Sequence, residues 1–417
     1  RVMVWSEFYL FTLFATFSYT QDTADLHLAR TYFDRLADDY ALGQFVRPVD
    51  GRQSSGSLVV KDPGNQVGRC LYGNITTGAC YFKDLIDWPL TTDSLVPDVE
   101  SPDRLCCRDG FVLNSANAPI AAHVWAAHQK LAWLATALGR PAAEASRYAE
   151  TATALKQGIL SHLRRPASAC EPPVGPCFAD GVNETHTSVQ STMYVIGHGV
   201  LSPAEAQPFL PFLVAKSQPF PRCSAALSHF LLEALYIIAE GQPDSNEAAD
   251  FAFELMARDG HRSWREMLSV NATMTIEHWY GVNMQKHTWA HGWSAGPARH
   301  LVRRIFGVRS DNGYETVTIH PQPPTNLTEG SMTLPTPRGH ISVSFERSDA
   351  FFELRVALPS TTTAHVCLPA GLLPPNAAVT LDKAPAAHVS PEQGQLCLLH
   401  MLGGGKAGGH TVMAVTK

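Results

Sequence analysis

Residues 119–163, PIAAHVWAAHQKLAWLATALGRPAAEASRYAETATALKQGILSHL, predict a pair of antiparallel helices. Apolar residues recur every three or four positions over 119–138 and again over 142–163, a spacing typical of amphipathic helices. Gly139 follows the first helix, and a glycine commonly stands where a helix ends. Because so few residues separate the two helices, we expect them to pack against each other as neighbours.

The same arrangement recurs on both sides of this hairpin. Two helices are expected within residues 6–40, joined at Thr20-Gln-Asp-Thr23, and others over residues 186–197, 224–240, 247–258 and 298–306. Ser202-Pro-Ala-Glu205 and Asp244-Ser-Asn-Glu247 have the pattern of capping boxes, which begin helices. Paired helices joined alternately by short turns and longer loops predict an α/α toroid, with the long loops gathered at one end to form the site.

The pattern changes near residue 308. Val317/Ile319, Ile341/Val343/Phe345 and Phe352/Leu354/Val356/Leu358 alternate with polar residues, and the alternation continues less clearly to Val412/Ala414. Short alternating runs separated by Gly, Pro, Asn and Asp predict strands of an antiparallel β-sandwich. We therefore predict two domains, a helical toroid over residues 1–307 and a β-sandwich over residues 308–417, with no catalytic constellation in the second.

Composition and charge exclude several classes of partner. The 417 residues are 45% hydrophobic and 17% charged, which is ample for a large core. The formal net charge of −6 gives no basic surface for nucleic acid. No apolar run is long enough to cross a bilayer, so we expect no membrane partner. The sequence does not indicate an oligomeric state.

The cysteines favour disulfides over metal binding. There are nine, and the pairs Cys70/Cys80 and Cys170/Cys177 each flank a turn-rich loop. Neither spacing is typical of zinc ligands, so we expect no metal and no other cofactor. An odd count leaves at least one thiol unpaired within the chain.

Features near the N-terminus and four glycosylation sequons bear on localisation. The sequons are at Asn74, Asn183, Asn271 and Asn326. Together with the loop cysteines they predict a secreted glycoprotein or one of the secretory lumen. The apolar run Phe8–Phe17 could be a signal-peptide core, but its continuation into further helical spacing favours a helix of the core.

A dense group of aromatic and histidine residues lies between residues 262 and 297. It contains half of the eight tryptophans around one carboxylate and three imidazoles: Trp264, Trp279, Trp289, Trp293, Glu277, His278, His287 and His291. Aromatic faces stack on sugar rings and polar side chains bind sugar hydroxyls, so this composition is typical of a carbohydrate site. The alternative is a tryptophan-rich joint between helices, although buried charges are costly unless they are paired or used.

The segment 44–110 is irregular and rich in Gly, Pro, Asp and Cys. Long irregular segments inside a domain usually line a site or cover it. This one contains Leu85-Ile-Asp-Trp-Pro89 and leads into Arg108-Asp-Gly-Phe111, which supply two acidic residues beside a tryptophan and an arginine. The alternative interpretation of each motif is a capped turn.

In their order along the chain, these segments resemble glycoside hydrolases of the α-L-rhamnosidase type, in which a six-hairpin (α/α)6 barrel precedes a small C-terminal β-sandwich. The resemblance covers nearly the whole chain. It is carried by Leu85–Pro89, Arg108–Phe111, Cys223–Tyr236, Arg262–Trp264, Thr275–Trp279, Trp289–Pro297, Ile305–Val308, Val317–Pro321 and Pro335–Gly339. It implies removal of terminal α-L-rhamnose from a glycoside or polysaccharide, with inversion of configuration and without a cofactor.

The resemblance also implies roles for individual residues. Glu277 matches the general base of the family's Thr-x-Trp-Glu-x-Trp motif, although Ile276 replaces the tryptophan before it, and His291 matches a sugar-contacting histidine. The family's motif for the general acid is not found, so we expect the acid upstream of residue 1. Asp87 and Asp109 are substitutes for the acid, and they more readily serve as ligands of sugar hydroxyls. The other expected sugar contacts are Trp88, Arg108, Trp264, Trp279 and Trp293.

Four alternatives remain open at this point. The chain could be a six-hairpin enzyme acting on another sugar, or a polysaccharide lyase. It could also be a carbohydrate-binding relative that has lost turnover. A structural α-solenoid is the fourth, but such a protein does not need a cluster of tryptophan, histidine and glutamate in its loops.

Overall fold

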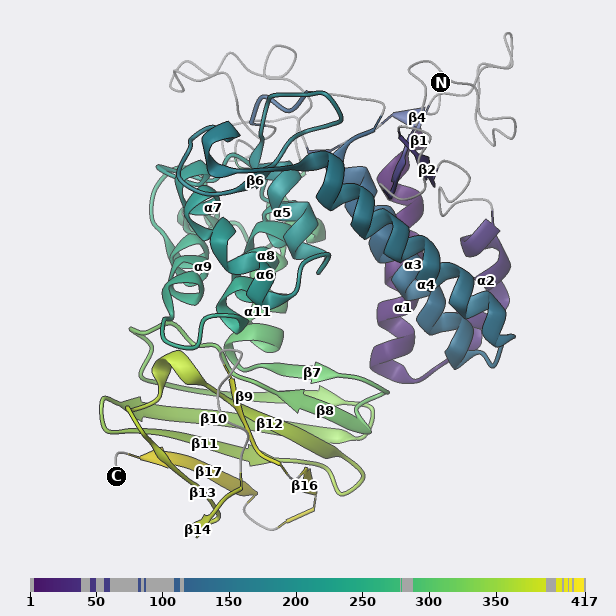
Figure 1. Ribbon diagram of the computed structural model, residues 1–417. Coiled ribbons are helices and arrows are strands. Elements are labelled where there is room, and N and C mark those ends of the chain that lie inside the picture. The colour runs from purple at the N-terminus through teal and green to yellow at the C-terminus, as the bar shows by residue number, and fades with distance from the viewer. Residues whose placement is uncertain are drawn as a thin grey trace.

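The computed structural model describes residues 4–38, 46–49, 56–60, 82–83, 86–87, 109–112, 116–277, 279, 288–387, 395–399, 401–403, 405–406 and 409–415. A helical part is followed by a β-rich part, which lies below it in Figure 1. Trp88 and Arg108, and the cysteines at 70, 80, 106 and 107, lie outside the described residues, so the predictions for them are not addressed.

The predicted hairpin of residues 119–163 is confirmed. Helix α3 (Ala118–Ala137) begins where the Asn117 side chain accepts a hydrogen bond from the Ile120 amide at 3.0 Å. Helix α4 (Ala142–Gly158) packs beside it, as Figure 1 shows, and a π-helical turn continues it from Ile159 to Leu163. Gly139, with φ +68°, lies in the turn between them.

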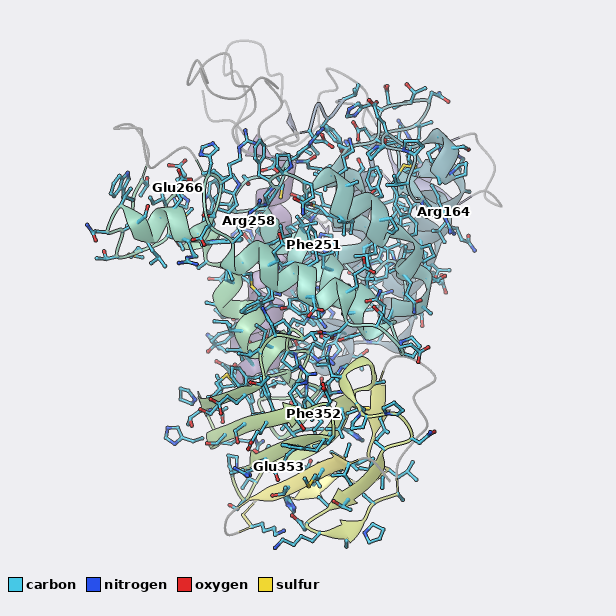
Figure 2. All side chains as sticks on the ribbon, turned by 90° about the vertical axis from the view of Figure 1, so that its left-hand side faces the viewer. Arg164, Phe251, Arg258, Glu266, Phe352 and Glu353 are labelled. Carbon is cyan, nitrogen blue, oxygen red and sulfur yellow. A yellow bond between two sulfur atoms is a disulfide. The ribbon has the colours of Figure 1, made fainter. Side chains whose placement is uncertain are left out.

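The helices alternate between an inner row and an outer row. Neighbouring pairs are α1 with α3, α3 with α5, α5 with α8, and α8 with α11, while α2, α4 and α9 pack outside α1, α3 and α8. The remaining bounds are α1 (Ser6–Thr23), α2 (His27–Asp38), α5 (Val189–Gly197), α6 (Pro203–Ala206), α7 (Leu210–Lys216), α8 (Ser228–Glu240), α9 (Glu247–Ala257), α10 (Trp264–Ser269) and α11 (Gly296–His300). Figure 2 shows α10, which carries Glu266, at the edge of the helical layer.

Some predicted helix ends differ from the structure. The turn between α1 and α2 follows Thr23 and includes Ala24 at φ +59°, so the predicted joint at residues 20–23 was too early. The capping box at Ser202 is confirmed, with both hydrogen bonds of the motif present. The one expected at Asp244 is wrong, because the N-cap of α9 is Asn246, whose side chain makes no capping bond.

The β-rich part contains two sheets. One has the antiparallel order β14-β13-β17-β11-β10-β9, and the other has the order β15-β12-β8-β7 with β16 added beside β12. The β8–β12 pair is parallel, so the sandwich is not antiparallel throughout as predicted. The strands are β7 (Val308–Ser310), β8 (Thr316–Ile319), β9 (Glu329–Thr336), β10 (Gly339–Ser348), β11 (Phe351–Ala357), β12 (Thr363–Pro369), β13 (Ala378–Leu381), β14 (Ala384–Pro385), β15 (Gln395–Cys397), β16 (Leu402–Gly403) and β17 (His410–Val415).

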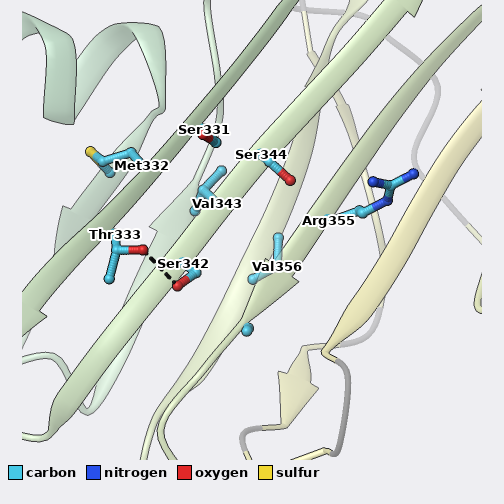
Figure 3. A pocket seen from close by; sticks show the side chains of 9 residues that line it. Ser331, Met332, Thr333, Ser342, Val343, Ser344, Arg355 and Val356 are labelled. Atoms are coloured by element: carbon cyan, nitrogen blue, oxygen red, sulfur yellow. Dashed lines mark hydrogen bonds between the residues drawn. The ribbon is translucent and has the colours of Figure 1, made fainter.

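The predicted alternation in β10 and β11 is confirmed. Val343, Phe345, Phe352 and Leu354 are buried between the sheets. The outer face of the same strands carries small polar side chains, and it forms the shallow pocket of Figure 3. Thr333 and Ser342 share a hydrogen bond of 3.1 Å there, and Arg355 lines the pocket opposite Ser344.

The two parts meet where the helical chain turns into strands. The π-helical turn after α11 ends at Ile305, and β7 begins at Val308. Gly307 between them has φ +72°, and a Cβ there would lie 2.0 Å from the His320 carbonyl. This position therefore requires glycine both for its conformation and for its space.

Short strands and disulfides complete the described chain. The strands are β1 (Val4–Trp5), β2 (Val46–Pro48), β3 (Ser57–Val59), β4 (Phe82–Lys83), β5 (Arg164–Arg165) and β6 (Cys177–Phe178). The predicted Cys170–Cys177 disulfide is confirmed, and Cys367–Cys397 joins β12 to β15. Cys223 is a free, buried thiol. Within the described residues, no helix could span a bilayer and no set of side chains could hold a metal ion.

Candidate functional site

Two segments of the tryptophan-rich region pair with each other around Glu277. The Glu277 amide donates to the Thr288 carbonyl at 3.0 Å, and the Thr288 amide donates to Oε2 of Glu277 at 3.1 Å. One step further, the His291 amide donates to the Thr275 carbonyl at 2.8 Å, and the Thr275 hydroxyl donates to the His291 carbonyl at 2.7 Å. The structure thus fixes Glu277 and His291 on one short ladder, both half-buried.

Trp293 connects these two residues. Its indole N–H donates to the Glu277 carbonyl at 2.9 Å, and the Ser294 hydroxyl donates to the same oxygen at 3.2 Å. The ring of Trp293 lies 4.3 Å from the ring of His291, measured between centroids. The structure therefore brings together three of the predicted site residues, and the backbone of Glu277 is held from both sides.

Trp279, two residues after Glu277, packs with Trp264 in a small apolar cluster. Trp279 is 1% exposed, and its indole N–H donates to the Cys223 carbonyl at 2.8 Å. Trp264 meets it edge to face, with ring centroids 4.9 Å apart, and donates its own N–H to the Ser294 carbonyl at 2.8 Å. The sequence placed Trp279 in a sugar-facing wall, whereas the structure places it in the core, because both its ring and its N–H are used within the protein.

Asp87 is also placed differently from its prediction. It is fully buried, and its Oδ2 accepts hydrogen bonds from the Gln190 side chain at 3.0 Å and from the Ser224 amide at 3.1 Å. A group that donates a proton to a glycosidic oxygen must be reachable by the substrate. In this structure Asp87 is enclosed by protein groups, and its role as acid or sugar ligand stays a prediction.

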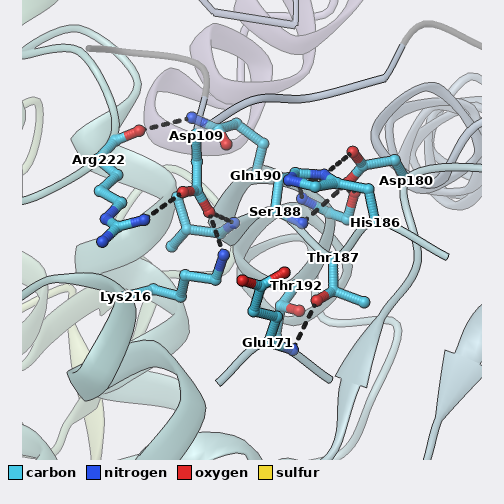
Figure 4. A network of polar contacts seen from close by, with 12 residues as sticks. Asp109, Glu171, Asp180, His186, Thr187, Ser188, Gln190, Thr192, Lys216 and Arg222 are labelled. Carbon is cyan, nitrogen blue, oxygen red and sulfur yellow. Dashed lines mark hydrogen bonds and ion pairs between the residues drawn. The ribbon is translucent and has the colours of Figure 1, made fainter. Parts of the chain in front are cut away.

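Asp109 lies in a buried ionic network beside the start of α5, shown in Figure 4. Its Oδ2 contacts Lys216 at 2.8 Å and accepts from the Val189 amide at 2.9 Å, and its Oδ1 contacts Arg222 at 3.0 Å. Asp109 is 1% exposed, and its role as acid or sugar ligand likewise stays a prediction. Its partners are two cations and a helix N-terminus, which are the usual counterparts of a structural carboxylate.

A second buried carboxylate in Figure 4, Asp180, was not predicted from the sequence. Its Oδ1 accepts from the Ser188 amide at 2.9 Å and from the Ser191 hydroxyl at 2.8 Å, and its Oδ2 contacts His186 at 2.6 Å. The hydrogen bond that the His186 ring makes to the Asp180 carboxylate raises the pKa of His186 above its ordinary value. The sequence did contain a local signal for the true start of α5. Ser188 caps this helix with its side chain, so the helix begins at Val189 and not at His186 as predicted.

The rest of the predicted cluster is only partly described. Trp289 is 43% exposed, next to the Thr288 that binds Glu277. His278 and His287 lie outside the described residues, together with Trp88 and Arg108. The described site is therefore a half-buried Glu277 whose carboxylate accepts from the Thr288 amide and whose backbone carbonyl accepts from the Trp293 indole, with the His291 ring packed against Trp293.

Two family models match adjacent parts of the chain. The model of the bacterial alpha-L-rhamnosidase 6 hairpin glycosidase domain matches residues 98–305, and that of the bacterial alpha-L-rhamnosidase C-terminal domain matches residues 306–379. The two matches meet where the helices give way to strands, and together they span about two thirds of the sequence.

Individual relatives agree with the models. The chain is 28% identical over 165 residues to an alpha-L-rhamnosidase of Formosa agariphila, a match that spans 37% of this chain and 18% of that protein. The crystal structure of a GH78 family rhamnosidase of Bacillus sp. GL1 has a TM-score of 0.60 at 20% identity, over 89% of this chain and 34% of that one. The alpha-L-rhamnosidase of Dictyoglumus thermophilum has a TM-score of 0.57 at 15% identity, over 75% and 33%.

These matches confirm the predicted fold class, a six-hairpin helical domain followed by a β-rich domain. The chain spans only about a third of the length of the solved structures and less of the curated relative.

Proposed function

Because the chain belongs to the α-L-rhamnosidase family of six-hairpin glycosidases, we propose that it carries the general-base half of a rhamnoside-hydrolysing site. Glu277 is the proposed base. The substrate class is a terminal α-L-rhamnoside, and the reaction is hydrolysis with inversion. The observation that carries the proposal is the ladder between residues 275–277 and 288–291, which holds Glu277 beside His291 and Trp293.

The chemistry follows from what such a carboxylate can do. In an inverting glycosidase, a carboxylate removes a proton from a water molecule while a carboxylic acid on the other face of the sugar protonates the leaving oxygen. The two carboxyl groups lie about 6.5–9.5 Å apart, which leaves room for the water. Glu277 has one oxygen bound by the Thr288 amide, which orients the group. The His291 imidazole, packed against the Trp293 ring, is the proposed ligand of a sugar hydroxyl.

We assign the acid to a segment outside the described residues. The burial of Asp87 and Asp109 and their internal hydrogen bonds argue against both. The short share of its relatives that this chain spans is consistent with an acid on another part of a longer protein.

Replacing Glu277 by glutamine tests the base. With an aryl α-L-rhamnoside as substrate of the full-length protein, Glu277→Gln is expected to lower kcat by about 10²- to 10⁴-fold, the usual contribution of general-base catalysis. Rhamnose binding, measured by calorimetry, is expected to persist, because glutamine keeps the shape of the side chain. Proton NMR of the first-formed rhamnose is expected to show the β-anomer.

Glu266→Gln is the matched control. Glu266 lies on α10 in the same region and accepts a hydrogen bond from the Arg262 amide at 2.9 Å, but the proposal gives it no chemical role. It is expected to keep kcat close to that of the wild type. Near-normal turnover by Glu277→Gln would overturn the assignment.

A carbohydrate-binding protein without turnover is the second candidate. It is favoured by the burial of both substitute acids, since a site with a base but no acid binds sugar without cleaving it efficiently. Rhamnose binding by the wild type with no detectable release of the aryl group supports this candidate. Turnover that depends on Glu277 excludes it.

A further inference from the structure

One peptide group connects the buried Asp87 to the indole of Trp279, two residues after Glu277. The Ser224 amide donates to Oδ2 of Asp87 at 3.1 Å and to Oδ1 at 3.3 Å. The carbonyl of the same peptide group, on Cys223, accepts from the indole N–H of Trp279 at 2.8 Å. The Cys223–Ser224 peptide is therefore held between a carboxylate on its N–H side and an indole on its C=O side.

Other contacts fix Asp87 and this peptide in place. The Tyr194 hydroxyl donates to the carbonyl of Ile86, the residue before Asp87, at 2.9 Å. The Gln190 side chain donates to Asp87 and also to the Arg222 carbonyl at 2.9 Å. Arg222 in turn contacts Asp109. Two carboxylates from the irregular segment thus bind residues 222–224: Asp87 binds the Ser224 amide and Asp109 binds the Arg222 side chain. These contacts within the protein account for the burial of both carboxylates.

The charge of Asp87 matters more than its shape in this arrangement. A carboxylate that accepts from a peptide N–H polarises the peptide and strengthens the hydrogen bond at its carbonyl, because hydrogen bonds in a chain reinforce one another in a low-dielectric interior. The thiol of Cys223, whose carbonyl binds Trp279, lies in the same buried and negatively charged surroundings. Burial raises the pKa of this thiol well above its ordinary value, and the charges of Asp87 and Asp109 raise it further.

Trp279 passes this restraint to the site. It lies two residues after Glu277, and its ring packs against Trp264, which binds the Ser294 carbonyl. The Ser294 hydroxyl donates to the Glu277 carbonyl at 3.2 Å. A shift of the Trp279 indole therefore moves the supports on which the Glu277 backbone rests.

We infer that Asp87 is a positioning residue for Glu277, acting through the Cys223–Ser224 peptide and the Trp279 indole. The inference rests on the proposed role of Glu277 as base, but the linkage itself can be measured without turnover. It gives the Asp-Trp motif of the irregular segment a function that needs no contact between Asp87 and the sugar.

The linkage is tested by NMR of the full-length protein with ¹⁵N-labelled tryptophan indoles. Trp279→Phe, which keeps an aromatic ring and removes the N–H, assigns the Trp279 signal. In Asp87→Asn this indole proton is expected to move upfield, because its hydrogen bond weakens. Asp180→Asn is the matched control: Asp180 is equally buried and binds backbone and hydroxyl groups, but within the described part of the chain the hydrogen bonds of its carboxylate go to residues 112 and 186–191 rather than to residues 222–224. Its Trp279 signal is expected to stay in place.

Kinetics test what the linkage does. Misplacing a catalytic group typically slows the chemical step, so Asp87→Asn and Trp279→Phe are each expected to lower kcat by about 10- to 100-fold with a much smaller change in KM. Their effects are expected to be less than multiplicative in the double variant, because both break one chain of contacts. Asp180→Asn combined with Trp279→Phe is expected to be multiplicative.

The outcomes separate this inference from the proposed function. Loss of turnover in Glu277→Gln, together with an unmoved Trp279 signal or an unchanged kcat in Asp87→Asn, overturns the inference alone. An unchanged kcat in Glu277→Gln overturns the proposed function, and the Trp279 signal then still decides the linkage. If Asp87→Asn does not fold, wild-type kcat in Trp279→Phe overturns the inference by itself.

Discussion

Arg304 is a residue on which the joint between the two domains depends. Its guanidinium contacts Glu233 at 2.6 Å and Glu240 at 2.5 Å, both on α8, and Arg309 of β7 also contacts Glu240. Burial alone would raise the pKa of Glu240, but Arg304 and Arg309 hold it below its ordinary value. Removing Arg304 would leave Glu240 with Arg309 alone and, among the described residues, Glu233 with only the His300 imidazole at 3.6 Å.

Arg304→Met is therefore expected to destabilise the protein by about 3–5 kcal/mol, the usual effect of removing one partner of a buried ion pair. The measurement is the free energy of unfolding from urea titration. Arg355→Met is the control, because Arg355 is 61% exposed and pairs with Glu353 on the sheet surface. An exposed pair contributes about 0–1 kcal/mol. Equal losses in the two variants would contradict the structural role given to Arg304.

The acidic residues also show how far single residues can be interpreted from sequence. Glu277, His291 and Trp293 were predicted within one cluster, and the structure joins them because they lie close together along the chain. Asp87 was placed in the site as well, but its partner amide belongs to a residue 137 positions away. The residues around Asp87 in the sequence do not indicate that its carboxylate will accept a hydrogen bond from so distant an amide.

At the scale of elements, periodicity and stop signals predicted most helices, because both act within a few residues. The start of α5 was missed since Asp180, outside the helix, binds Ser188 and Ser191. Strand β9 was also missed because contacts with another part of the chain define it. None of its residues is fully buried, so no alternation of apolar residues marks it, and its pairing with β10 defines it instead.

The crossing of α5 and α8 gives a prediction for one element pair. A Cβ at Gly197 would lie 2.7 Å from the Phe230 carbonyl, closer than side chains approach backbone. Gly197→Ala is expected to push the helices apart and to destabilise the protein by about 1–3 kcal/mol, as overpacking does, and thermal unfolding measures it. Gly403→Ala is the control, because nothing lies within 4 Å of its added Cβ. A Gly197→Ala protein as stable as the wild type would show that the helices can separate freely.

Across the whole molecule, three buried histidines and the half-buried His229 link stability to pH. His123, His229 and His300 stand on inner helices, and His320 lies at the domain joint. Burial lowers the pKa of these four groups to about 3, 4, 3 and 4 respectively. In the unfolded chain an imidazole takes up a proton near pH 6.5. The folded state keeps these rings neutral, so their contribution to stability is complete above pH 6.5 and is lost as the pH falls toward their folded pKa values.

The free energy of unfolding is therefore expected to fall between pH 6.5 and pH 5, by about 1.4 kcal/mol per pH unit for each such imidazole. Carboxylates with lowered pKa values, such as Asp382 at about 2, titrate below this window and do not obscure it. His320 offers the sharpest variant, because neither of its ring nitrogens has a hydrogen-bond partner in the described part of the chain. His320→Leu is expected to reduce the slope by about one proton and to raise stability at pH 5, as measured by urea unfolding across the range. A slope that stays the same in His320→Leu would mean that this ring is not held neutral by burial.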